Sequence, residues 1–203
     1  MRTRRALARL GWALSRWRHV SQPVPPSGNG VLIGAPHTSA WDFFFMLGIT
    51  WSLGLRMHFL AKHTLFRPAP LGWFMRACGG IPVDRANPAG IVDDLVARVR
   101  AGERFYLVIA PEGTRRPGAR WKSGFYRIAT DAGLPVTLGY IDRTTMTAGL
   151  GPTFTPSGDV HADMDLVRAF YRDISGVRPS PRPEPRLAEE DRGWRVTPPA
   201  SSR

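Results

Sequence analysis

Cysteine, acidic residues and long apolar runs are all scarce in this sequence of 203 residues. The single cysteine, Cys78, cannot form a disulfide within the chain or build a cysteine-based metal site, and it fits a reducing compartment. The longest nearly apolar run, 43–55, has about 13 residues, whereas a membrane-spanning helix needs roughly 20. We therefore predict no transmembrane helix.

The shortage of acidic residues leaves the chain strongly basic. It has 16 Asp and Glu against 28 Lys and Arg, a net charge of +12. Such a balance favours an anionic partner, which is a nucleic acid, an anionic membrane surface or a phosphorylated substrate. A compositional bias of the source genome toward arginine codons would produce part of the same excess, so the charge alone does not choose among these partners.

Several common catalytic motifs are also missing. The sequence has no G-x-S-x-G, no H-E-x-x-H and no P-loop, which excludes the usual patterns of serine hydrolases, zinc proteases and nucleotide triphosphatases. The four histidines other than His37 have no paired ligand spacing. We expect neither a metal site nor a cofactor.

Short apolar segments alternate with helical patterns along most of the chain, which predicts an α/β fold. Strands are expected at 30–35, 56–61, 80–83, 104–110 and 135–141, and helices at 41–53, 71–77, 87–100, 122–132 and 163–173. A Thr- and Gly-rich piece, 144–156, separates the last strand from the last helix. We expect a single domain over 21–177 with a mostly parallel mixed sheet flanked by helices. Residues 178–203 are rich in proline and charge, and we predict that they are disordered.

Residues 1–20 have the pattern of a basic amphipathic helix. They lack a continuous apolar core and a small-residue cleavage site, so a secretory signal is not expected. Leucines and arginines fall on opposite helical faces: Leu7, Leu10 and Leu14 on one, Arg2, Arg5, Arg9 and Arg16 on the other. The helix either lies in a membrane interface or packs on the domain with a solvated basic face, and the sequence favours neither.

A histidine and an aspartate follow the first expected strand. His37 comes just after that strand, where open α/β sheets form their ligand crevices, and Asp42 opens the next helix. A histidine moves protons near neutral pH, and a carboxylate can orient it. We therefore interpret His37 and Asp42 as a general-base pair, although the spacing alone is a weak indication.

Polar clusters follow two more strands. Asp84 and Arg85 end the strand at 80–83, where they form either an anion site or a surface ion pair. Ala110-Pro111-Glu112-Gly113-Thr114-Arg115 follows the strand at 104–110. A glycine there lets backbone N–H groups approach an anion, and an arginine can neutralise it. Parallel strands would bring these clusters to the same edge as His37, which predicts an anion-and-hydroxyl site.

Three sequence blocks, HTSAWD, GGIPVDR and PEGTR, resemble in order and spacing those of the glycerolipid acyltransferase family, the lysophosphatidic acid acyltransferases and their relatives. The resemblance covers roughly residues 30–145 and implies a glycerol-3-phosphate acyltransferase-like fold. It implies that His37 deprotonates a hydroxyl, with Asp42 orienting the imidazole. The hydroxyl then attacks an acyl thioester directly, without an acyl-enzyme. It further implies that Arg85, Glu112, Gly113, Thr114 and Arg115 hold the phosphate and glycerol of the acceptor.

The sequence departs from the family pattern at several positions. Pro36 stands where the family commonly has Asn before the histidine, and Arg116 where a serine usually follows EGTR. Lys122-Ser123-Gly124 replaces a more basic block. These departures affect acceptor identity more than catalysis.

The resemblance predicts acyl transfer from acyl-CoA or acyl-carrier protein to a lysophosphatidate-like or other anionic lipid. We expect the protein in the cytoplasm, peripheral on the inner face of the membrane, with no nucleic-acid partner. Two alternatives stay open. One is a non-catalytic basic protein that binds membrane or nucleic acid, and the other is a degenerate acyltransferase fold that carries lipid.

Overall fold

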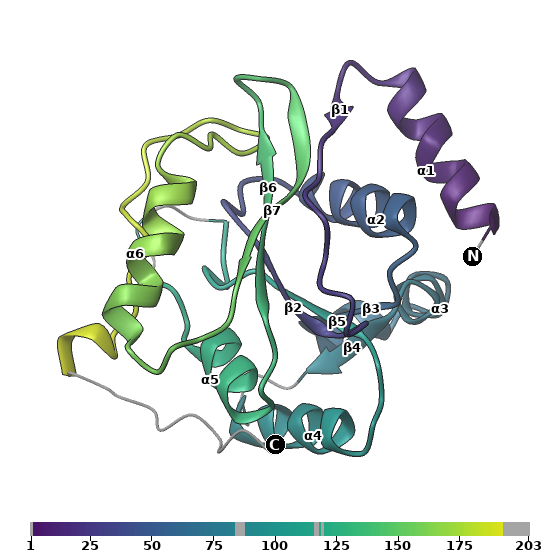
Figure 1. The fold of residues 1–203 in the computed structure, drawn as a ribbon. Helices are drawn as coiled ribbons and strands as arrows, with labels where there is room; N and C mark the ends of the chain where they lie inside the picture. Colours follow the sequence, from purple (N-terminus) through teal and green to yellow (C-terminus); the bar gives the residue numbers. More distant parts are fainter. Residues whose placement is uncertain (1, 84–87, 116–117, 119, 193–203) are drawn as a thin grey trace.

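A seven-stranded sheet forms the centre of the computed structural model, which describes residues 2–83, 88–115, 118 and 120–192 (Figure 1). The strand order is β1-β7-β6-β2-β5-β3-β4. Neighbours are parallel except β6 and β7, which run antiparallel. The predicted mostly parallel mixed sheet is therefore confirmed. The strands are β1 (Arg18–His19), β2 (Gly30–Gly34), β3 (Met57–Lys62), β4 (Gly80–Val83), β5 (Tyr106–Ile109), β6 (Val136–Asp142) and β7 (Thr147–Phe154).

Helices cover both faces of this sheet. Figure 1 shows α1, α2 and α3 on one side and α4, α5 and α6 on the other. Every helix expected from the sequence is present, and most ends lie within three residues of the expected positions. The helix expected over 1–20 ends at Leu14, because residues 18–19 leave it to form β1. The helices are α1 (Arg2–Leu14), α2 (Asp42–Leu53), α3 (Ala69–Ala77), α4 (Pro88–Arg100), α5 (Gly124–Asp131) and α6 (Val160–Tyr171), with short 3₁₀ turns η1 (His63–Phe66) and η2 (Glu190–Arg192).

Strand β2 is the most enclosed part of the sheet. It pairs with β5 on one side and β6 on the other, both in parallel. Val31 and Ile33 belong to the apolar core under α4, α5 and α6, whereas Leu32 points to the core on the opposite face. All three side chains are buried because alternate residues of a strand face opposite sides. The segment that carries His37 therefore leaves a rigid, fully packed strand.

The carboxyl ends of β2, β3, β4 and β5 lie at one edge of the sheet because these strands are parallel. His37 follows β2 at this edge, and Glu112 follows β5. This edge is where open α/β sheets place their ligand sites.

The structure adds a hairpin partner that the sequence pattern did not predict. Residues 147–154, within the Thr- and Gly-rich piece, form β7, which pairs with β6 and with the two-residue strand β1. A Cβ at Gly149 would lie 1.7 Å from the carbonyl oxygen of Val20. Glycine in β7 therefore reflects the close approach of the N-terminal segment and not a loop.

The disorder predicted for residues 178–203 is wrong for residues 178–192, which pack against the domain. Leu187 is fully buried in the main core. Glu190 is buried and accepts hydrogen bonds from the N–H of Leu187 and from Arg168. The folded part thus extends past the predicted boundary at residue 177. The remainder of the tail lies outside the described residues.

Candidate active site

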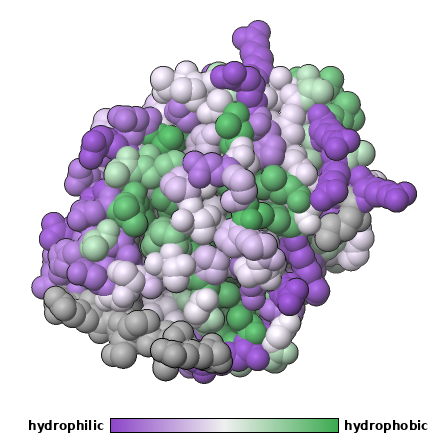
Figure 2. Space-filling model, viewed as in Figure 1, coloured by the Kyte–Doolittle hydropathy of each residue, from purple (hydrophilic) through white to green (hydrophobic). Residues whose placement is uncertain are grey.

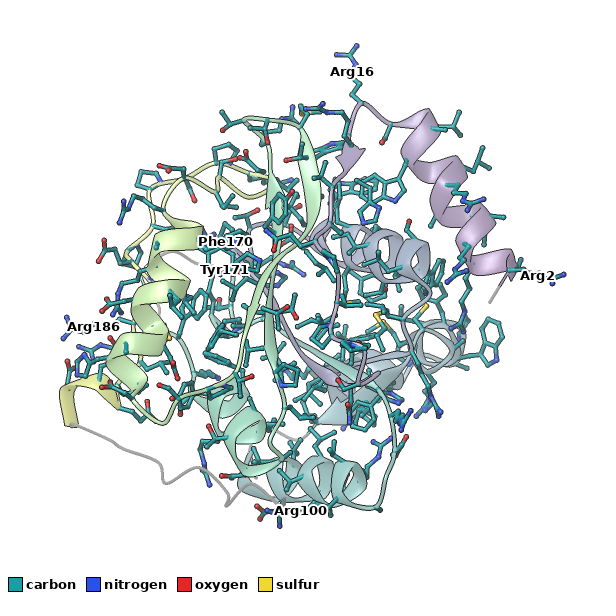
Figure 3. All side chains as sticks on the ribbon, in the orientation of Figure 1. Arg2, Arg16, Arg100, Phe170, Tyr171 and Arg186 are labelled. Atoms are coloured by element: carbon teal, nitrogen blue, oxygen red, sulfur yellow. The ribbon has the colours of Figure 1, made fainter. Side chains whose placement is uncertain are left out.

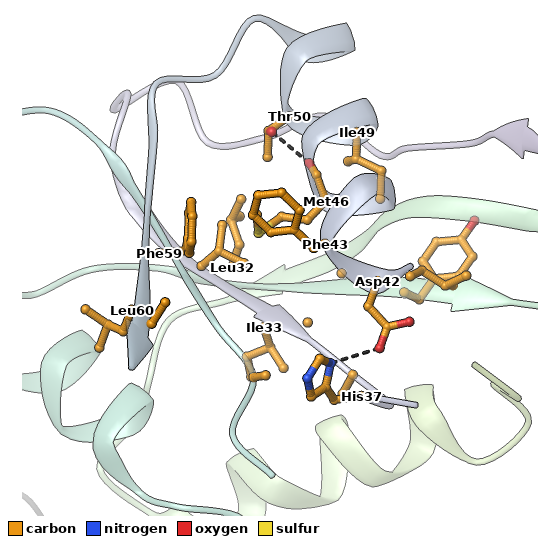
Figure 4. Close-up of a pocket in the computed structure, with 18 of the residues that line it drawn as sticks. Leu32, Ile33, His37, Asp42, Phe43, Met46, Ile49, Thr50, Phe59 and Leu60 are labelled. Atoms are coloured by element: carbon orange, nitrogen blue, oxygen red, sulfur yellow. Dashed lines mark hydrogen bonds and ion pairs between the residues drawn. The ribbon is translucent and has the colours of Figure 1, made fainter. Parts of the chain in front are cut away.

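His37 and Asp42 meet beyond the end of β2, as the sequence predicts. The His37 Nδ1 atom lies 2.8 Å from Asp42 Oδ2, and Figure 4 marks this contact with a dashed line. An ionised carboxylate only accepts hydrogen bonds, so Nδ1 carries the hydrogen of a neutral ring and Nε2 keeps the lone pair. The His37 side chain is 26% exposed, compared with 11% for Asp42. The arrangement leaves a proton-accepting nitrogen within reach of a bound molecule.

Asp42 is held by the turn that precedes it. Its Oδ2 atom also accepts hydrogen bonds from the backbone N–H groups of Thr38, at 2.8 Å, and Ser39, at 2.9 Å. Asp42 is the first residue of α2, where the helix dipole stabilises a negative charge. One oxygen atom therefore fixes both the imidazole and the turn. The other, Oδ1, is buried and has no hydrogen-bond partner among the described residues.

Glu112 faces the protein's own groups. Its Oε1 accepts a hydrogen bond of 3.0 Å from the backbone N–H of His37, and its Oε2 accepts one from the Arg182 guanidinium. Burial raises the pKa of Glu112, although the His37 hydrogen bond and the Arg182 charge act in the opposite direction. These contacts indicate that Glu112 fixes the main chain at His37. The acceptor-binding role that the resemblance implies for Glu112 stays a prediction.

The rest of the Glu112–Arg115 block forms a tight turn. Gly113 has a φ of +64°, and a Cβ there would lie 3.0 Å from Lys122 Cε. Thr114 is half-buried. Arg115 is exposed, lines the pocket next to His37, and forms no ion pair with the residues that the structure describes. Arg115 is therefore the side chain of this block best placed to meet an anion.

Arg85 lies outside the described residues, so its predicted role in anion binding stays a prediction. Strand β4 ends at Val83 in parallel register with β3. The chain therefore enters the undescribed segment at the same sheet edge as His37.

A pocket of about 390 Å³ opens beside His37 and extends between α2 and the sheet (Figure 4). Its ionisable lining near the opening consists of His37, Asp42 and Arg115, and Thr50 and Tyr140 add two hydroxyl groups. The remainder of the wall is mainly apolar and includes Leu32, Phe43, Met46, Ile49, Phe59 and Leu60. Among the three phenylalanines of 43–45, this places Phe43 in the pocket wall, whereas Phe45 packs with Trp12 and Trp17. The pocket fits a molecule with an apolar chain and a polar end.

A family model described as Acyltransferase matches residues 18–138, which include the His37–Asp42 pair and the block at 112–115. The chain belongs to the acyltransferase family. The matched range runs from β1 into β6 and holds all of β2, β3, β4 and β5. The resemblance drawn from the HTSAWD and PEGTR blocks is confirmed.

Curated relatives of this acyltransferase-family chain carry one shared name. A 1-acyl-sn-glycerol-3-phosphate acyltransferase of Streptococcus pneumoniae is 30% identical over 97 residues, 48% of this chain and 36% of that protein. The chloroplastic 1-acyl-sn-glycerol-3-phosphate acyltransferase BAT2 of Brassica napus is 31% identical over 162 residues, 76% of this chain and 44% of that protein. The chain thus spans less than half the length of these relatives.

A solved structure shares the fold of this acyltransferase-family chain. The 1-acyl-sn-glycerophosphate (LPA) acyltransferase PlsC of Thermotoga maritima superposes with a TM-score of 0.53 and is 17% identical, covering 77% of this chain and 69% of that one. At this identity the likeness shows a common fold.

One residue at the candidate site was missed by sequence reasoning. Arg182 comes from the segment predicted to be disordered, yet it pairs with Glu112 and donates to the backbone carbonyl oxygens of His37 and Arg115, at 3.3 Å each. No local pattern marks it, because its carboxylate partner lies 70 positions earlier in the chain.

Helix α1 packs on the acyltransferase domain with the side opposite to its leucines. Ala8 is buried, and the Trp12 ring packs against α2 at Gly48 while its Nε1 donates to Ser52. Two arginines also face the domain: Arg4 donates to the carbonyl oxygen of Ala77 and Arg5 to that of Leu53. The helix thus packs on the domain and its arginines stay exposed, but the face that it packs is not the leucine face.

The leucine face of α1 is left in solvent. Leu7, Leu10 and Leu14 are 55%, 56% and 80% exposed. Figure 2 shows hydrophobic surface beside hydrophilic surface at the upper right, over α1. In Figure 3 Arg2 and Arg16 project away from the domain near the two ends of this helix. None of the helices in the described part is long and apolar enough to cross a bilayer.

Proposed function

We propose that the protein transfers an acyl group from an acyl thioester to a hydroxyl of a lysophosphatidate-like or other anionic lipid, with His37 as the general base. The observation that carries this proposal is the His37–Asp42 pair at the entrance of an apolar pocket in an acyltransferase-family domain. The reaction is a proposal for this chain because the chain spans less than half the length of its curated relatives.

The proposed reaction begins with proton transfer. His37 Nε2 takes the proton of the acceptor hydroxyl as its oxygen attacks the thioester carbonyl carbon. Asp42 Oδ2, 2.8 Å from Nδ1, stabilises the imidazolium that forms. The tetrahedral intermediate then collapses, the carbon–sulfur bond breaks, and the thiolate leaves with the proton returned by His37. The products are an ester and a free thiol, so atoms and charge balance without an acyl-enzyme.

The apolar pocket supports a place for the acyl chain. Its wall lies between α2 and the sheet, and it reaches the His37 ring, where the thioester carbonyl would sit (Figure 4). Burying an acyl chain in this pocket is favourable by roughly 0.8 kcal/mol per CH₂ group. The bound acyl chain would thus hold the reacting carbonyl carbon beside His37.

Arginines support an anionic headgroup on the acceptor. Arg115 is exposed at the polar end of the pocket, and its planar guanidinium suits a phosphate. Arg85 is the second candidate from the sequence. Neither arginine decides whether the acyl donor is acyl-CoA or acyl-carrier protein.

The surface of α1 supports binding of the protein to a membrane. Exposed leucines flanked by arginines are typical of a helix that lies in the headgroup region of an anionic bilayer. Trp41, just before α2, and Trp73, on α3, are further exposed aromatic residues. We propose a peripheral enzyme on the cytoplasmic face of the membrane.

The test is an acyl-transfer assay with the purified protein, acyl-CoA or acyl-carrier protein, and a panel of lysophospholipids resolved by mass spectrometry. His37→Ala is expected to lower the rate by at least about 10²-fold, the scale of a lost general base. His58→Ala is the matched control, because His58 does not line the pocket. A folded wild-type protein that acylates no acceptor, or an active His37→Ala variant, would contradict catalysis and favour a binding protein.

A further inference from the structure

We propose that Arg182 is a positioning residue for acyl transfer: it fixes the Glu112 carboxylate, and through it the main chain that carries His37. The inference rests on the proposed function, because it assigns a role within the same site. Arg182 belongs to the C-terminal strap, residues 178–192, which lies outside the range matched by the family model.

The guanidinium of Arg182 binds three acceptors, and all three belong to predicted site residues. Nη1 pairs with Glu112 Oε2, and Nη2 donates to the carbonyl oxygens of His37 and Arg115. One planar group thereby joins the loop after β2 to the loop after β5. A guanidinium suits this task because its donors are rigidly spaced, whereas an ammonium is a single point of charge.

The contact reaches the catalytic histidine in two ways. Glu112 accepts from the His37 N–H through Oε1 while Arg182 holds Oε2. Arg182 also donates directly to the His37 carbonyl oxygen. Both backbone polar groups of His37 are therefore fixed by this pair of side chains. The imidazole keeps its contact with Asp42 only if the main chain stays in this place.

The Arg182–Glu112 ion pair is largely buried. The Arg182 and Glu112 side chains are 15% and 8% exposed. Removing the arginine leaves a carboxylate that is almost fully enclosed and has lost its counter-charge, which favours protonation of Glu112 or movement of the groups around it. The His37 N–H donates to that carboxylate, so a change there shifts the main chain of His37.

The strap is itself anchored on both sides of Arg182. At its start, the N–H of Arg178 donates to Thr38 Oγ1 at 3.0 Å, within the HTSAWD block. At its far end Leu187 is buried in the main core. A pocket of about 640 Å³ lies between the strap and α6 and is bordered by Pro36. The strap therefore braces the His37 loop from the side opposite to the substrate pocket.

A comparison of four variants tests the proposal. Arg182→Ala is expected to lower kcat by about 10- to 10²-fold, the scale of a misplaced catalytic group, with the KM for the acyl donor changed less than threefold. Arg182→Lys keeps the charge but not the fork, so it should recover thermal stability and only part of kcat. Arg186→Ala is the matched control, since Arg186 pairs with exposed Asp191 on the same strap. It should match the wild type.

The double variant Arg182→Ala/Glu112→Gln separates positioning from stabilisation. It removes the uncompensated carboxylate, so thermal stability should recover while kcat stays low. Recovery of kcat together with stability would overturn the proposal, because Arg182 would then serve only to neutralise Glu112.

Backbone hydrogen exchange gives a readout that needs no activity. Peptides covering 36–43 and 110–115 should exchange faster in Arg182→Ala than in the wild type, and at the wild-type rate in Arg186→Ala. Unchanged exchange in Arg182→Ala refutes the inference, whether or not the wild type acylates a lipid. A wild type inactive on every acceptor refutes the proposed function, and faster exchange would still show that Arg182 positions this loop.

Discussion

Replacing Asp42 by asparagine is the sharpest perturbation of the proposed base. Asparagine has the same shape, and its side-chain oxygen can accept from Thr38, Ser39 and the imidazole, as Asp42 Oδ2 does. Its NH₂ group takes the place of Oδ1, which has no hydrogen-bond partner among the described residues. The variant therefore keeps the geometry of the turn and removes the negative charge.

The expected loss follows from the charge. Two unit charges about 4 Å apart at an effective dielectric constant of about 20 interact by roughly 4 kcal/mol. The His37 side chain is 26% exposed, so solvent screens part of this energy, and the asparagine dipole retains some more. A loss of about 2–4 kcal/mol in transition-state stabilisation corresponds to a kcat about 30- to 10³-fold lower.

The assay is release of free thiol from a saturating acyl thioester, with ester formation checked by mass spectrometry. Asp93→Asn serves as the control, because Asp93 is an exposed carboxylate on α4. Thermal unfolding should show that the Asp42→Asn variant is folded. Its melting temperature should fall slightly, because a negative charge has been removed from the helix N-terminus. A kcat within threefold of the wild type would refute the role of Asp42 in stabilising the imidazolium.

Two further predictions concern the surfaces around the site. Replacing Leu7, Leu10 and Leu14 together by serine should weaken binding to anionic vesicles at least about tenfold in a sedimentation assay, because each leucine buries apolar area in the interface. Leu166→Ser, at an equally exposed leucine on α6, is the control, and equal binding by both variants would contradict the assignment. Met46→Phe should reduce transfer of a 16-carbon chain at least about tenfold relative to an eight-carbon chain, because the ring fills part of the pocket, whereas Met46→Leu should change the ratio little. Equal losses for both chain lengths would count against the pocket as the acyl site.

The parallel part of the fold could be predicted from sequence because its strands are short, apolar and separated by amphipathic helices. Every residue of β2 is buried or nearly so, and such a strand is apolar throughout. Strand β7 could not be predicted this way, since glycines and a proline within it are typical of a loop. The need for Gly149 arises from Val20, more than a hundred positions away, and becomes visible only in the folded chain.

The candidate site also has one part that could be predicted from sequence and one part that could not. The contact between His37 and Asp42 was predictable because both residues lie in one strand-to-helix turn, which leaves little choice of geometry. The contacts of Glu112 were not, because its partners come from two segments far from it in sequence. Composition also misled for residues 178–192. Prolines and charges usually indicate disorder, but here the charged groups find buried partners and one leucine enters the core.

The C-terminal strap also sets when the site can be completed during synthesis. Arg182 is made 70 positions after Glu112, which at bacterial and eukaryotic rates of about 5–20 residues per second is a delay of roughly 4–14 s. Throughout that interval the nascent chain already contains His37, Asp42 and Glu112. A fragment that stops at residue 177 keeps every block of the family and never acquires the arginine. The candidate site is therefore completed late, by a part of the chain that contains none of the family's sequence blocks.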